Sequence, residues 1–595
     1  MTVNLRNSIR ASINPGLRQS ISGGVDALGL FRSSSLDLQF AAKKTLTDRV
    51  SGSNLITFNR ASSGNSAATY VDSDGLIKAS PVNLLKYSEQ FNLWSKGSNT
   101  TITVNAVAAP DESMTADRVE MPATNSTYIQ QLGLIDSGTE YTGSVWAKAV
   151  TPGTNNQFTF QYGTGAGAVT STFFATGEWE RFTSTVTPTD SGNFNINNVG
   201  DTFDVDVYLW GAQLQKNSTI SDYVPSGSAS SGAPRFDHDP ATGESLGLLI
   251  EEGRTNQLLF SETFGQGAWT KSLVTVTNNV IVAPDGATTA DKMSASRTAN
   301  DARHIRQDSS IVAGKIYTQT VFAKAGEVTV LQIAPSSGFN TDFQNFDLST
   351  GQLGSGGAGA ATIEPYGNGW YRCSKSRYAT STRQGRMLIG MVNSATSARV
   401  ESFQADAGDG LYLWGAQLEE DATFSSSYIP STNSAVSRSP DIATIEGTNF
   451  TGGGWYNQSE GTIFSDISPL DADSDRAYLF SNGTDTQRLG QNTESTSTFA
   501  LFMSKGSATS LSVAASGMPK PIKACLAYKP GSSRGVIDGQ LQTLSTTSNV
   551  PNAINQIGLG SQSHGSGGGF LNGHIARFSY FPTRKADSDL VKMTS

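Results

Sequence analysis

Three aspartates on alternate residues, Asp471, Asp473 and Asp475, have the spacing in this sequence that best suits metal chemistry. Carboxylates that converge from one loop, together with backbone carbonyls and water, bind hard cations such as calcium. The segment lacks the glycine and the closing glutamate of an EF-hand loop. Calcium is therefore the one cofactor that the sequence offers, and no other is expected. The DSDG stretch at residues 72–75 instead predicts a hairpin turn.

Adjacent carboxylates could supply the acid pair of a glycoside hydrolase. Retaining enzymes of that class place two carboxyl groups about 5–5.5 Å apart, a separation that a sequence does not show. Glu251 with Glu252, and Glu419 with Glu420, are candidates by adjacency alone. We expect these four residues to be solvated turn carboxylates.

The remaining chemistry-bearing residues are few. The histidines are His238, His304, His564 and His574, and the cysteines are Cys373 and Cys525. No HExxH motif, zinc spacing, GxSxG elbow or GxxxxGK[ST] loop is present, so the sequence predicts no enzyme. We expect the histidines to lie on the surface or to be hydrogen-bonded within the fold. The separated cysteines give no disulfide framework and are expected to be small buried residues.

Aromatic side chains are the remaining candidates for ligand contact. Trp94, Trp269, Trp179 and Trp370 stand beside polar turns, where a sugar could reach them, and they are the predicted carbohydrate-binding residues. Trp210 and Trp414 lie in strand-like YLWGAQL runs that are apolar on both faces, which is typical of a covered central strand. In the first run, Tyr208, Trp210, Ala212 and Leu214 should point one way, and Val207, Leu209 and Gly211 the other. Trp210 and Trp414 are therefore predicted to be core residues.

Composition limits the classes of protein. The chain has 595 residues, of which 37% are hydrophobic and only 16% charged, with 61 glycines. This favours short strands and turns over helices. The net charge of −9 argues against nucleic-acid binding. No apolar run is long enough for a transmembrane helix, and the start lacks a signal-peptide core, so we expect cytoplasmic synthesis and no membrane insertion.

The N-terminal stretch carries Arg6, Arg10 and Arg18 with no acidic residue before Asp26. One interpretation is a frayed terminus. The other is a peptide that docks into a larger assembly, and these arginines are then the predicted attachment residues.

Most of the chain is a duplication. NLLKYSEQF (83–91) matches NQLLFSETF (256–264), APDESMTADRV (109–119) matches APDGATTADKM (283–293), EYTGSVWAKA (140–149) matches IYTQTVFAKA (316–325), and YLWGAQL occurs at 208–214 and 412–418. The matches keep their order, which indicates two copies of one domain. Short β-rich runs between Gly, Pro, Asp and Asn predict a jelly-roll β-sandwich for each copy. The second copy is longer, and STGQLGSGGAGAA (349–361) reads as an extended turn or loop.

The predicted organisation is all-β. It comprises an N-terminal attachment segment (1–35), a β connector in two parts (36–82 and 231–255), jelly-roll module 1 (83–230), jelly-roll module 2 (256–436) and a C-terminal sandwich (437–595). The two connector parts should meet, so that module 1 is inserted between them. In the C-terminal region, Asp538-Gly539 predicts a primed hairpin turn, and the run GHIARFSYFP (573–582) predicts a strand with one face in water.

Two resemblances follow from these motifs. The stretches GTIFSDI, KACLAYKPG…GVIDGQ and NGHIARFSYFPTRKADSDL resemble laminin-G-like or concanavalin-like lectin domains, a family that often binds sugars. The phrases FNRASSGNSAATYVDSDGLIK, PRFDHDPATGESLGLLIEEGRTN and YLWGAQLEE…YIP resemble virion proteins of tailed bacteriophages, especially tail fibres. In that family the DSDGLIK and PRFDHDP phrases usually lie close together, whereas here a whole predicted sandwich separates them.

The resemblances imply a phage tail fibre that recognises a host cell-surface glycan. They also imply a homotrimer, other virion proteins as partners of the N-terminus, and location in the virion. A capsid-surface fibre or decoration protein without a receptor role is the alternative, and a polysaccharide-degrading tailspike is the third hypothesis.

Overall fold

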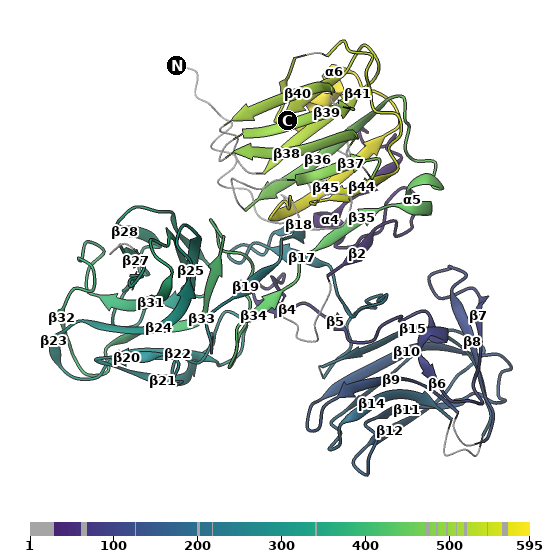
Figure 1. The fold of residues 1–595 in the computed structure, drawn as a ribbon, viewed down its shortest axis with the longest axis horizontal. Coiled ribbons are helices and arrows are strands. Elements are labelled where there is room, and N and C mark those ends of the chain that lie inside the picture. The colour runs from purple at the N-terminus through teal and green to yellow at the C-terminus, as the bar shows by residue number, and fades with distance from the viewer. Residues whose placement is uncertain are drawn as a thin grey trace. The chain divides into compact units, whose positions relative to one another are not determined.

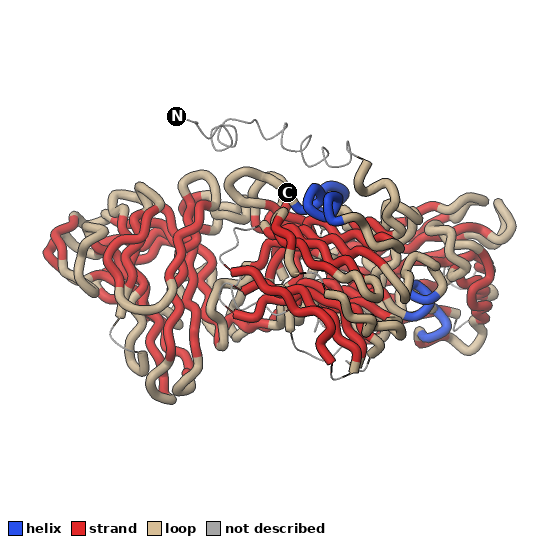
Figure 2. Tube along the Cα trace, turned by 90° about the horizontal axis from the view of Figure 1, so that it is seen from above, coloured by secondary structure: helices blue, strands red, loops and turns tan. Residues whose placement is uncertain are grey.

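The computed structural model describes residues 29–60, 68–124, 127–198, 203–216, 218–339, 342–470, 476–483, 486–495, 498–506, 508–516, 521–543, 545–561 and 569–595. The chain forms two compact units. The inserted unit combines Asn59–Ser66 with Ser80–Ala233, and the main unit combines Met1–Phe58, Ala67–Ala79 and Pro234–Ser595. Strands dominate both units, as Figure 2 shows, and the protein is all-β.

The inserted unit is a sandwich of two five-stranded sheets, which we call module 1 (Figure 1). One sheet has the order β13 (Glu180–Val186), β10 (Tyr141–Ala149), β15 (Val205–Gln215), β8 (Ala116–Met121) and β7 (Thr101–Val107). The other has the order β12 (Val169–Phe174), β11 (Gln157–Tyr162), β14 (Gly192–Asn197), β9 (Tyr128–Ile135) and β6 (Ser95–Lys96). A 3₁₀ turn, η1 (Phe91–Leu93), and the pair β5 (Val82–Asn83) and β16 (Ser231–Gly232) complete the unit.

Module 2, within the main unit, repeats this order with one additional edge strand on each sheet. Its first sheet runs β21 (Val274–Ile281), β22 (Ala290–Ala295), β33 (Gly410–Glu420), β25 (Ile316–Lys324), β30 (Trp370–Tyr378) and β29 (Ala361–Pro365). Its second sheet runs β20 (Thr270–Ser272), β24 (Arg303–Ile311), β31 (Arg383–Val392), β26 (Val330–Ile333), β27 (Gln344–Asp347) and β28 (Gln352–Gly356). A short pair, β23 (Ala299–Asp301) and β32 (Phe403–Ala405), lies beside them. Strand β28 forms inside the segment 349–361 that was expected to be a turn or loop, and β29 begins at its last residue, so that expectation was wrong for 352–356 and holds for the turns on either side.

The YLWGAQL strands β15 and β33 are covered on both faces, as their apolar composition predicts. Each strand contains a β-bulge, because Gly211 and Gly415 adopt φ of 63° and 61°, and the pairing register shifts there. A bulge reverses the alternation of side chains. Trp210 therefore packs outside the sandwich, whereas Ala212 and Leu214 point into its core. The expected common face for these three residues was wrong, but the predicted burial of Trp210 and Trp414 is confirmed.

The C-terminal sandwich also consists of two sheets, and the expected connector supplies part of both. The first sheet runs β17 (Arg235–His238), β18 (Ser245–Ile250), β45 (Gly573–Phe581), β36 (Gly461–Pro469), β41 (Ile522–Tyr528), β42 (Arg534–Ile537) and β43 (Gln540–Leu541), with β1 (Leu36–Leu38) also on β45. The second runs β2 (Thr57–Asn59), β35 (Ile442–Ile445), β44 (Gln556–Leu559), β37 (Arg476–Ser481), β38 (Gln487–Ser495), β39 (Thr498–Lys505) and β40 (Ala508–Ser516). Strands β1, β2, β17 and β18 of the expected connector are therefore integral to this sandwich, and the connector is not a separate small domain.

Smaller elements close the main unit. The hairpin of β3 (Thr69–Val71) and β4 (Ile77–Ala79) turns at Asp72–Gly75, as predicted, and β19 (Arg254–Asn256) pairs with β34 (Val436–Arg438). The described helices are α4 (Phe40–Lys43), α5 (Gly447–Thr451) and α6 (Asp587–Thr594). Over the described part of the chain, no helix is both long and apolar enough to span a bilayer.

Strand β45 does not have the solvent-facing side that its alternation predicts. Ile575, Phe578 and Tyr580 belong to the core between the two sheets. On the other side, Phe581 joins a second core with Phe31 and with Leu590 of α6. The charged residue of that strand, Arg577, lies 3.6 Å from the centre of the Phe31 ring. Residues before β1 and helix α6 thus cover the face that was expected to meet water.

Candidate binding pocket and its buried ion network

The main unit contains a cavity of about 450 Å³. Its walls come from the hairpin β3–β4, from β17 and the turn that follows it, and from the edge of module 2 around β29 and β30. The lining is completed by residues 423–425, 427 and 428 and by Leu246, Leu249, Glu251, Leu470 and His574 of the C-terminal sandwich. The cavity therefore depends on segments that are far apart in the sequence.

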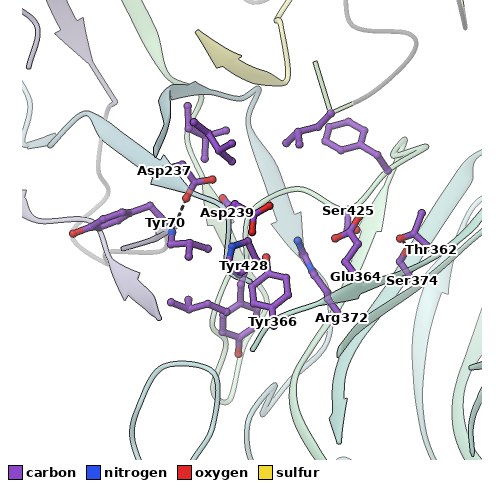
Figure 3. Close-up of a pocket in the computed structure, with 18 of the residues that line it drawn as sticks. Tyr70, Asp237, Asp239, Thr362, Glu364, Tyr366, Arg372, Ser374, Ser425 and Tyr428 are labelled. Carbon is purple, nitrogen blue, oxygen red and sulfur yellow. Dashed lines mark hydrogen bonds between the residues drawn. The ribbon is translucent and has the colours of Figure 1, made fainter. Parts of the chain in front are cut away.

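Polar and aromatic side chains share the lining, as Figure 3 shows. The polar residues include Asp237, Asp239, Glu364, Arg372, Thr362, Ser374, Ser425, His238 and His574, and the tyrosines are Tyr70, Tyr366 and Tyr428. Carboxylates accept hydrogen bonds, guanidinium groups donate them and hydroxyls do both. Burial, with the nearby charges of Asp72 and Asp237, raises the pKa of Tyr70, so its hydroxyl keeps its proton at neutral pH.

Hydrogen bonds fix Asp237 and His238 in the wall of the cavity. Asp237 accepts the backbone N–H of Val71 at 2.6 Å and lies 2.8 Å from Nε2 of His574. His238 places its Nδ1 3.0 Å from the carbonyl of Val71. The expectation of hydrogen-bonded histidines is confirmed for His574 and for Nδ1 of His238. It was wrong for His304, which is partly buried and whose Nδ1 is shielded from water with no partner among the described residues. Asp237 thus joins the hairpin β3–β4 to the C-terminal sandwich.

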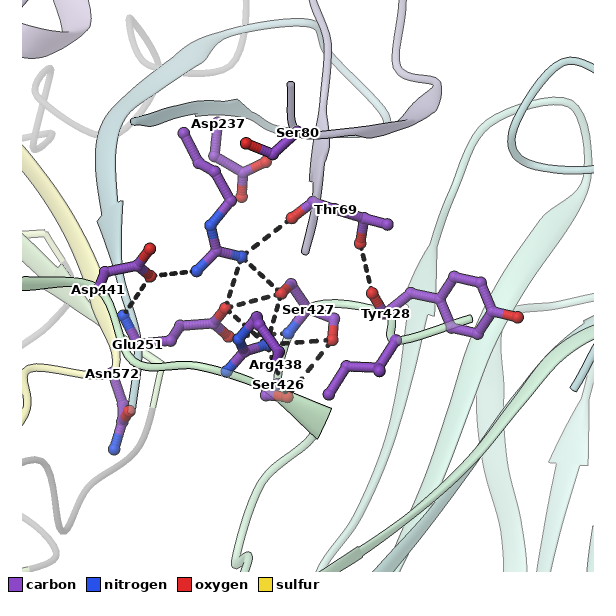
Figure 4. Close-up of polar contacts among 12 residues, drawn as sticks. Thr69, Ser80, Asp237, Glu251, Ser426, Ser427, Tyr428, Arg438, Asp441 and Asn572 are labelled. Atoms are coloured by element: carbon purple, nitrogen blue, oxygen red, sulfur yellow. Dashed lines mark hydrogen bonds and ion pairs between the residues drawn. The ribbon is translucent and has the colours of Figure 1, made fainter. Parts of the chain in front are cut away.

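One wall of the cavity rests on a buried ion network (Figure 4). Glu251 lies 2.8 Å from Nη1 of Arg235 and 3.0 Å from Nη1 of Arg438, and all three side chains are buried. Arg235 also pairs with Asp441, whose carboxylate accepts the backbone N–H of Glu251 at 3.0 Å. The members come from β17, from the end of β18, from β34 and from the segment before β35. Ser427, which follows β33 of module 2, donates its N–H to Glu251 at 2.8 Å and accepts from Arg235 at 2.6 Å, so the network links both sandwiches of the main unit.

Glu251 is ionised in this network. Burial alone would raise the pKa of its carboxyl group, but the guanidinium groups of Arg438 and Arg235 and two hydrogen bonds from Ser427 hold that pKa well below its ordinary value. Glu419 is buried as well, and its carboxylate accepts hydrogen bonds from the N–H of Ser426 at 3.1 Å and from the hydroxyl of Ser426. The expectation that both glutamates are solvated turn residues was wrong, because each has its bonding partners inside the fold.

Three of the four predicted sugar-contacting tryptophans are core residues. Trp94, Trp269 and Trp370 are 5%, 1% and 2% exposed. Their indole N–H groups donate to the carbonyls of Tyr87, Phe260 and Val282 at 3.0, 3.1 and 3.1 Å. These rings present no open face to a sugar, because neighbouring side chains cover them. Trp179 alone is partly exposed, and its indole N–H donates to the carbonyl of Ala108 at 3.0 Å.

The remaining predicted residues do not belong to this cavity. Asp471, Asp473 and Asp475 fall outside the described residues, as do Arg6, Arg10, Arg18 and His564, so calcium binding and attachment stay predictions. Within the described ranges, no group of three or more His, Cys, Asp or Glu side chains could hold a metal ion. Cys373 and Cys525 are buried free thiols, as expected.

The sequence matches no family model and no curated protein. Among solved structures, the chain is similar to the CBM22-1–CBM22-2 tandem domain of Paenibacillus barcinonensis Xyn10C, with 12% identity over 57% of this chain and 98% of that one and a TM-score of 0.21. It is also similar to domains LG4-5 of the mouse laminin α1 chain, with 9% identity over 49% of this chain and 88% of that one and a TM-score of 0.17. A sialidase from Trypanosoma rangeli is similar with 10% identity over 90% of this chain and 97% of that one and a TM-score of 0.19. At such scores these similarities carry no argument about function.

Proposed function

We propose that this chain is a non-catalytic glycan-binding protein of a bacteriophage virion appendage, and that its sugar site is the pocket of the main unit. The observation that supports the sugar site is the lining. Asp237, Asp239 and Glu364 offer acceptors for vicinal hydroxyl groups, while Tyr70 and Tyr366 add aromatic surface with a polar end. Pockets of about 300–1,000 Å³ with a few placed polar groups are the usual form of small-ligand sites.

The virion location rests on the phrases of sequence that resemble phage tail fibres. Within this proposal, the chain acts as a homotrimer whose sites share one glycan surface, so that several weak contacts add avidity. The N-terminal arginines contact other virion proteins. Labelled antibodies against the chain, imaged on purified virions, distinguish a tail appendage from a capsid-surface fibre.

Titration of the full chain with a panel of purified bacterial surface polysaccharides tests the pocket. Glu364→Gln and Asp239→Asn should each weaken binding about tenfold, the equivalent of about 1.4 kcal/mol for a lost charged hydrogen bond. Glu180→Gln, a change of the same kind on the exposed edge strand of module 1, is the matched control and should bind as the parent does. Equal binding by all variants would place the sugar elsewhere, and release of reducing ends would establish an enzyme.

A structural role without sugar binding is the second candidate. The buried tryptophans and the ion network that links both sandwiches favour it, because they stabilise the framework and offer nothing to a ligand. This candidate predicts that no polysaccharide in the panel binds.

A further inference from the structure

The duplicated modules differ in what covers one aromatic face. In module 2 the face is formed by Phe322, Trp370, Trp414 and Tyr428, all buried in one cluster with Val71 and Ile77 of the hairpin β3–β4. Tyr366 of module 2 adds an edge-to-face contact with Phe322, with ring centres 4.9 Å apart. The hairpin therefore acts as a lid on this face.

Polar contacts fix the hairpin in its place on module 2. The N–H of Ile77 donates to the carbonyl of Pro284 at 3.0 Å, and Nζ of Lys78 donates to the carbonyl of Asp285 at 3.1 Å. The hydroxyl of Thr69 donates to the carbonyl of Tyr428 at 2.6 Å. The accepting groups belong to the APDG turn and the closing YIP segment, both of which are repeated in module 1.

In module 1 the corresponding face has no such lid among the described residues of its own unit. The sequence matches pair Trp146 with Phe322, Trp179 with Trp370, Trp210 with Trp414 and Tyr223 with Tyr428. Trp146, Trp179 and Tyr223 are only partly buried in their cluster, and Trp210 is the single buried ring of the four. Partly exposed aromatic rings gathered on one face of a soluble domain mark an interaction site.

The acceptors that hold the hairpin on module 2 are also present on module 1. Pro110, Asp111 and Tyr223 correspond to Pro284, Asp285 and Tyr428. Within the described ranges, no group donates a hydrogen bond to the carbonyls of Pro110, Asp111 or Tyr223. The aromatic face of module 1 therefore matches the face of module 2 that the hairpin β3–β4 covers, both in its apolar rings and in its carbonyl acceptors.

One position sets the two sites apart. Gly286 has φ of 88°, and a Cβ atom there would lie 3.1 Å from Leu76 of the hairpin. Module 1 carries the exposed Glu112 at this position, also with positive φ, 69°. A leucine facing Glu112 would meet a carboxylate side chain, whereas a basic residue would pair with it.

We propose that the face formed by Trp146, Trp179, Trp210 and Tyr223 is a docking site for a β-hairpin of a partner protein. The partner hairpin resembles residues 69–79 but carries lysine or arginine where this chain has Leu76. It covers the aromatic rings with two apolar side chains, donates to the three carbonyls and pairs its basic residue with Glu112. Backbone and pocket contacts of this kind are a general mode of β-peptide recognition.

A cyclised peptide of residues 68–80 tests this proposal, because a free hairpin of this size is only marginally stable in water. Peptides with Leu76 and with Leu76→Lys are labelled, shown by NMR to form the hairpin, and titrated against the full chain. The Leu76→Lys peptide should bind at least about tenfold more tightly than the Leu76 peptide. Glu112→Gly in the protein should reverse this order, and Trp179→Ala should weaken both peptides.

Glu140→Gln removes an exposed carboxylate at the far end of β10 and is the matched control, which should leave both affinities unchanged. The proposal is overturned if the folded peptides do not bind, or if the Glu112→Gly substitution leaves the order of their affinities unchanged. It is also overturned if surface polysaccharide, rather than peptide, binds in a manner that Trp179→Ala abolishes, since the face would then be a sugar site. The pocket variants Glu364→Gln and Asp239→Asn separate these results from the proposed glycan function.

Discussion

Arg577 donates two hydrogen bonds, each of 2.8 Å, to the carboxylate of Asp37, a residue 540 positions earlier in the chain. Asp37 is fully buried and also accepts from Arg49 and Ser579. The contact stands beside the pairing of β1 with β45, so the earliest described strand is bound to the last one by both backbone and charge.

Asp37→Asn should destabilise the C-terminal sandwich by about 3–5 kcal/mol, because it removes the buried negative charge that pairs with Arg577 and Arg49. The midpoint of urea unfolding measures the loss. Asp589→Asn on α6, whose carboxylate is 4.0 Å from Lys592 at the surface, is the control and should cost less than about 1 kcal/mol. Equal midpoints for parent and Asp37→Asn would contradict the assigned role.

Acid should destabilise the main unit through Glu251. The pKa of this carboxyl group is lower in the folded chain than its ordinary value of 4.5, so the folded state favours the ionised form. The corresponding stability is fully present above about pH 4.5 and is lost progressively as the pH falls below it. Unfolding midpoints measured from pH 7 to pH 3 should fall steeply for the parent chain.

Glu251→Gln should lower stability at pH 7 and flatten this dependence on pH. Glu252→Gln, at the neighbouring and partly exposed carboxylate, should keep the parent's slope. An unchanged slope for Glu251→Gln would show that other groups cause the acid sensitivity.

Asp466 should act with the opposite sign. Burial raises the pKa of its carboxyl group to about 6, against partial compensation by Lys523, so the folded chain disfavours the ionised form. The destabilisation is present above about pH 6 and disappears as the pH falls below about 4. Asp466→Asn should therefore stabilise the protein at pH 7.5 by on the order of 1–3 kcal/mol. Calorimetry at pH 7.5 and pH 4 should show a gain in melting temperature only at the higher pH.

The bulge glycines offer a paired test of the duplication. Alanine at Gly415 would place its Cβ 2.8 Å from Phe322, and alanine at Gly211 would place its Cβ 3.2 Å from Trp146. Both positions also require positive φ, so each substitution should cost at least about 1 kcal/mol. The loss should be larger for Gly415→Ala, because Phe322 is packed under the hairpin β3–β4 and Trp146 is not. Thermal unfolding of the two variants would contradict this account if Gly211→Ala were the more damaging.

Local patterns made much of the fold predictable. The turn at Asp538-Gly539 has φ of 43° and 75°, as a primed turn requires, and the repeated phrases form matching strands in the two modules. Such features depend on neighbouring residues alone, so the sequence displays them directly.

The buried ion network was not predictable in the same way. Arg235 and Asp441 are 206 positions apart, and nothing near Glu251 in the sequence indicates that two guanidinium groups surround it. The one available signal was the presence of charges at both ends of the apolar run SLGLLI. Similarly, the polar turns beside Trp94 and Trp269 gave no sign that each indole N–H bonds to a carbonyl nine or fewer residues away.

The position of β45 determines when the C-terminal sandwich can fold. This strand pairs with β1, β18 and β36 at once, so the sheet stays open until residues 573–581 have left the ribosome. Contacts between residues this far apart in sequence form slowly, and strand edges that are still unpaired promote aggregation during that time. Synthesis rate and temperature should therefore govern the yield of soluble protein more strongly than the stability of the finished sandwich does.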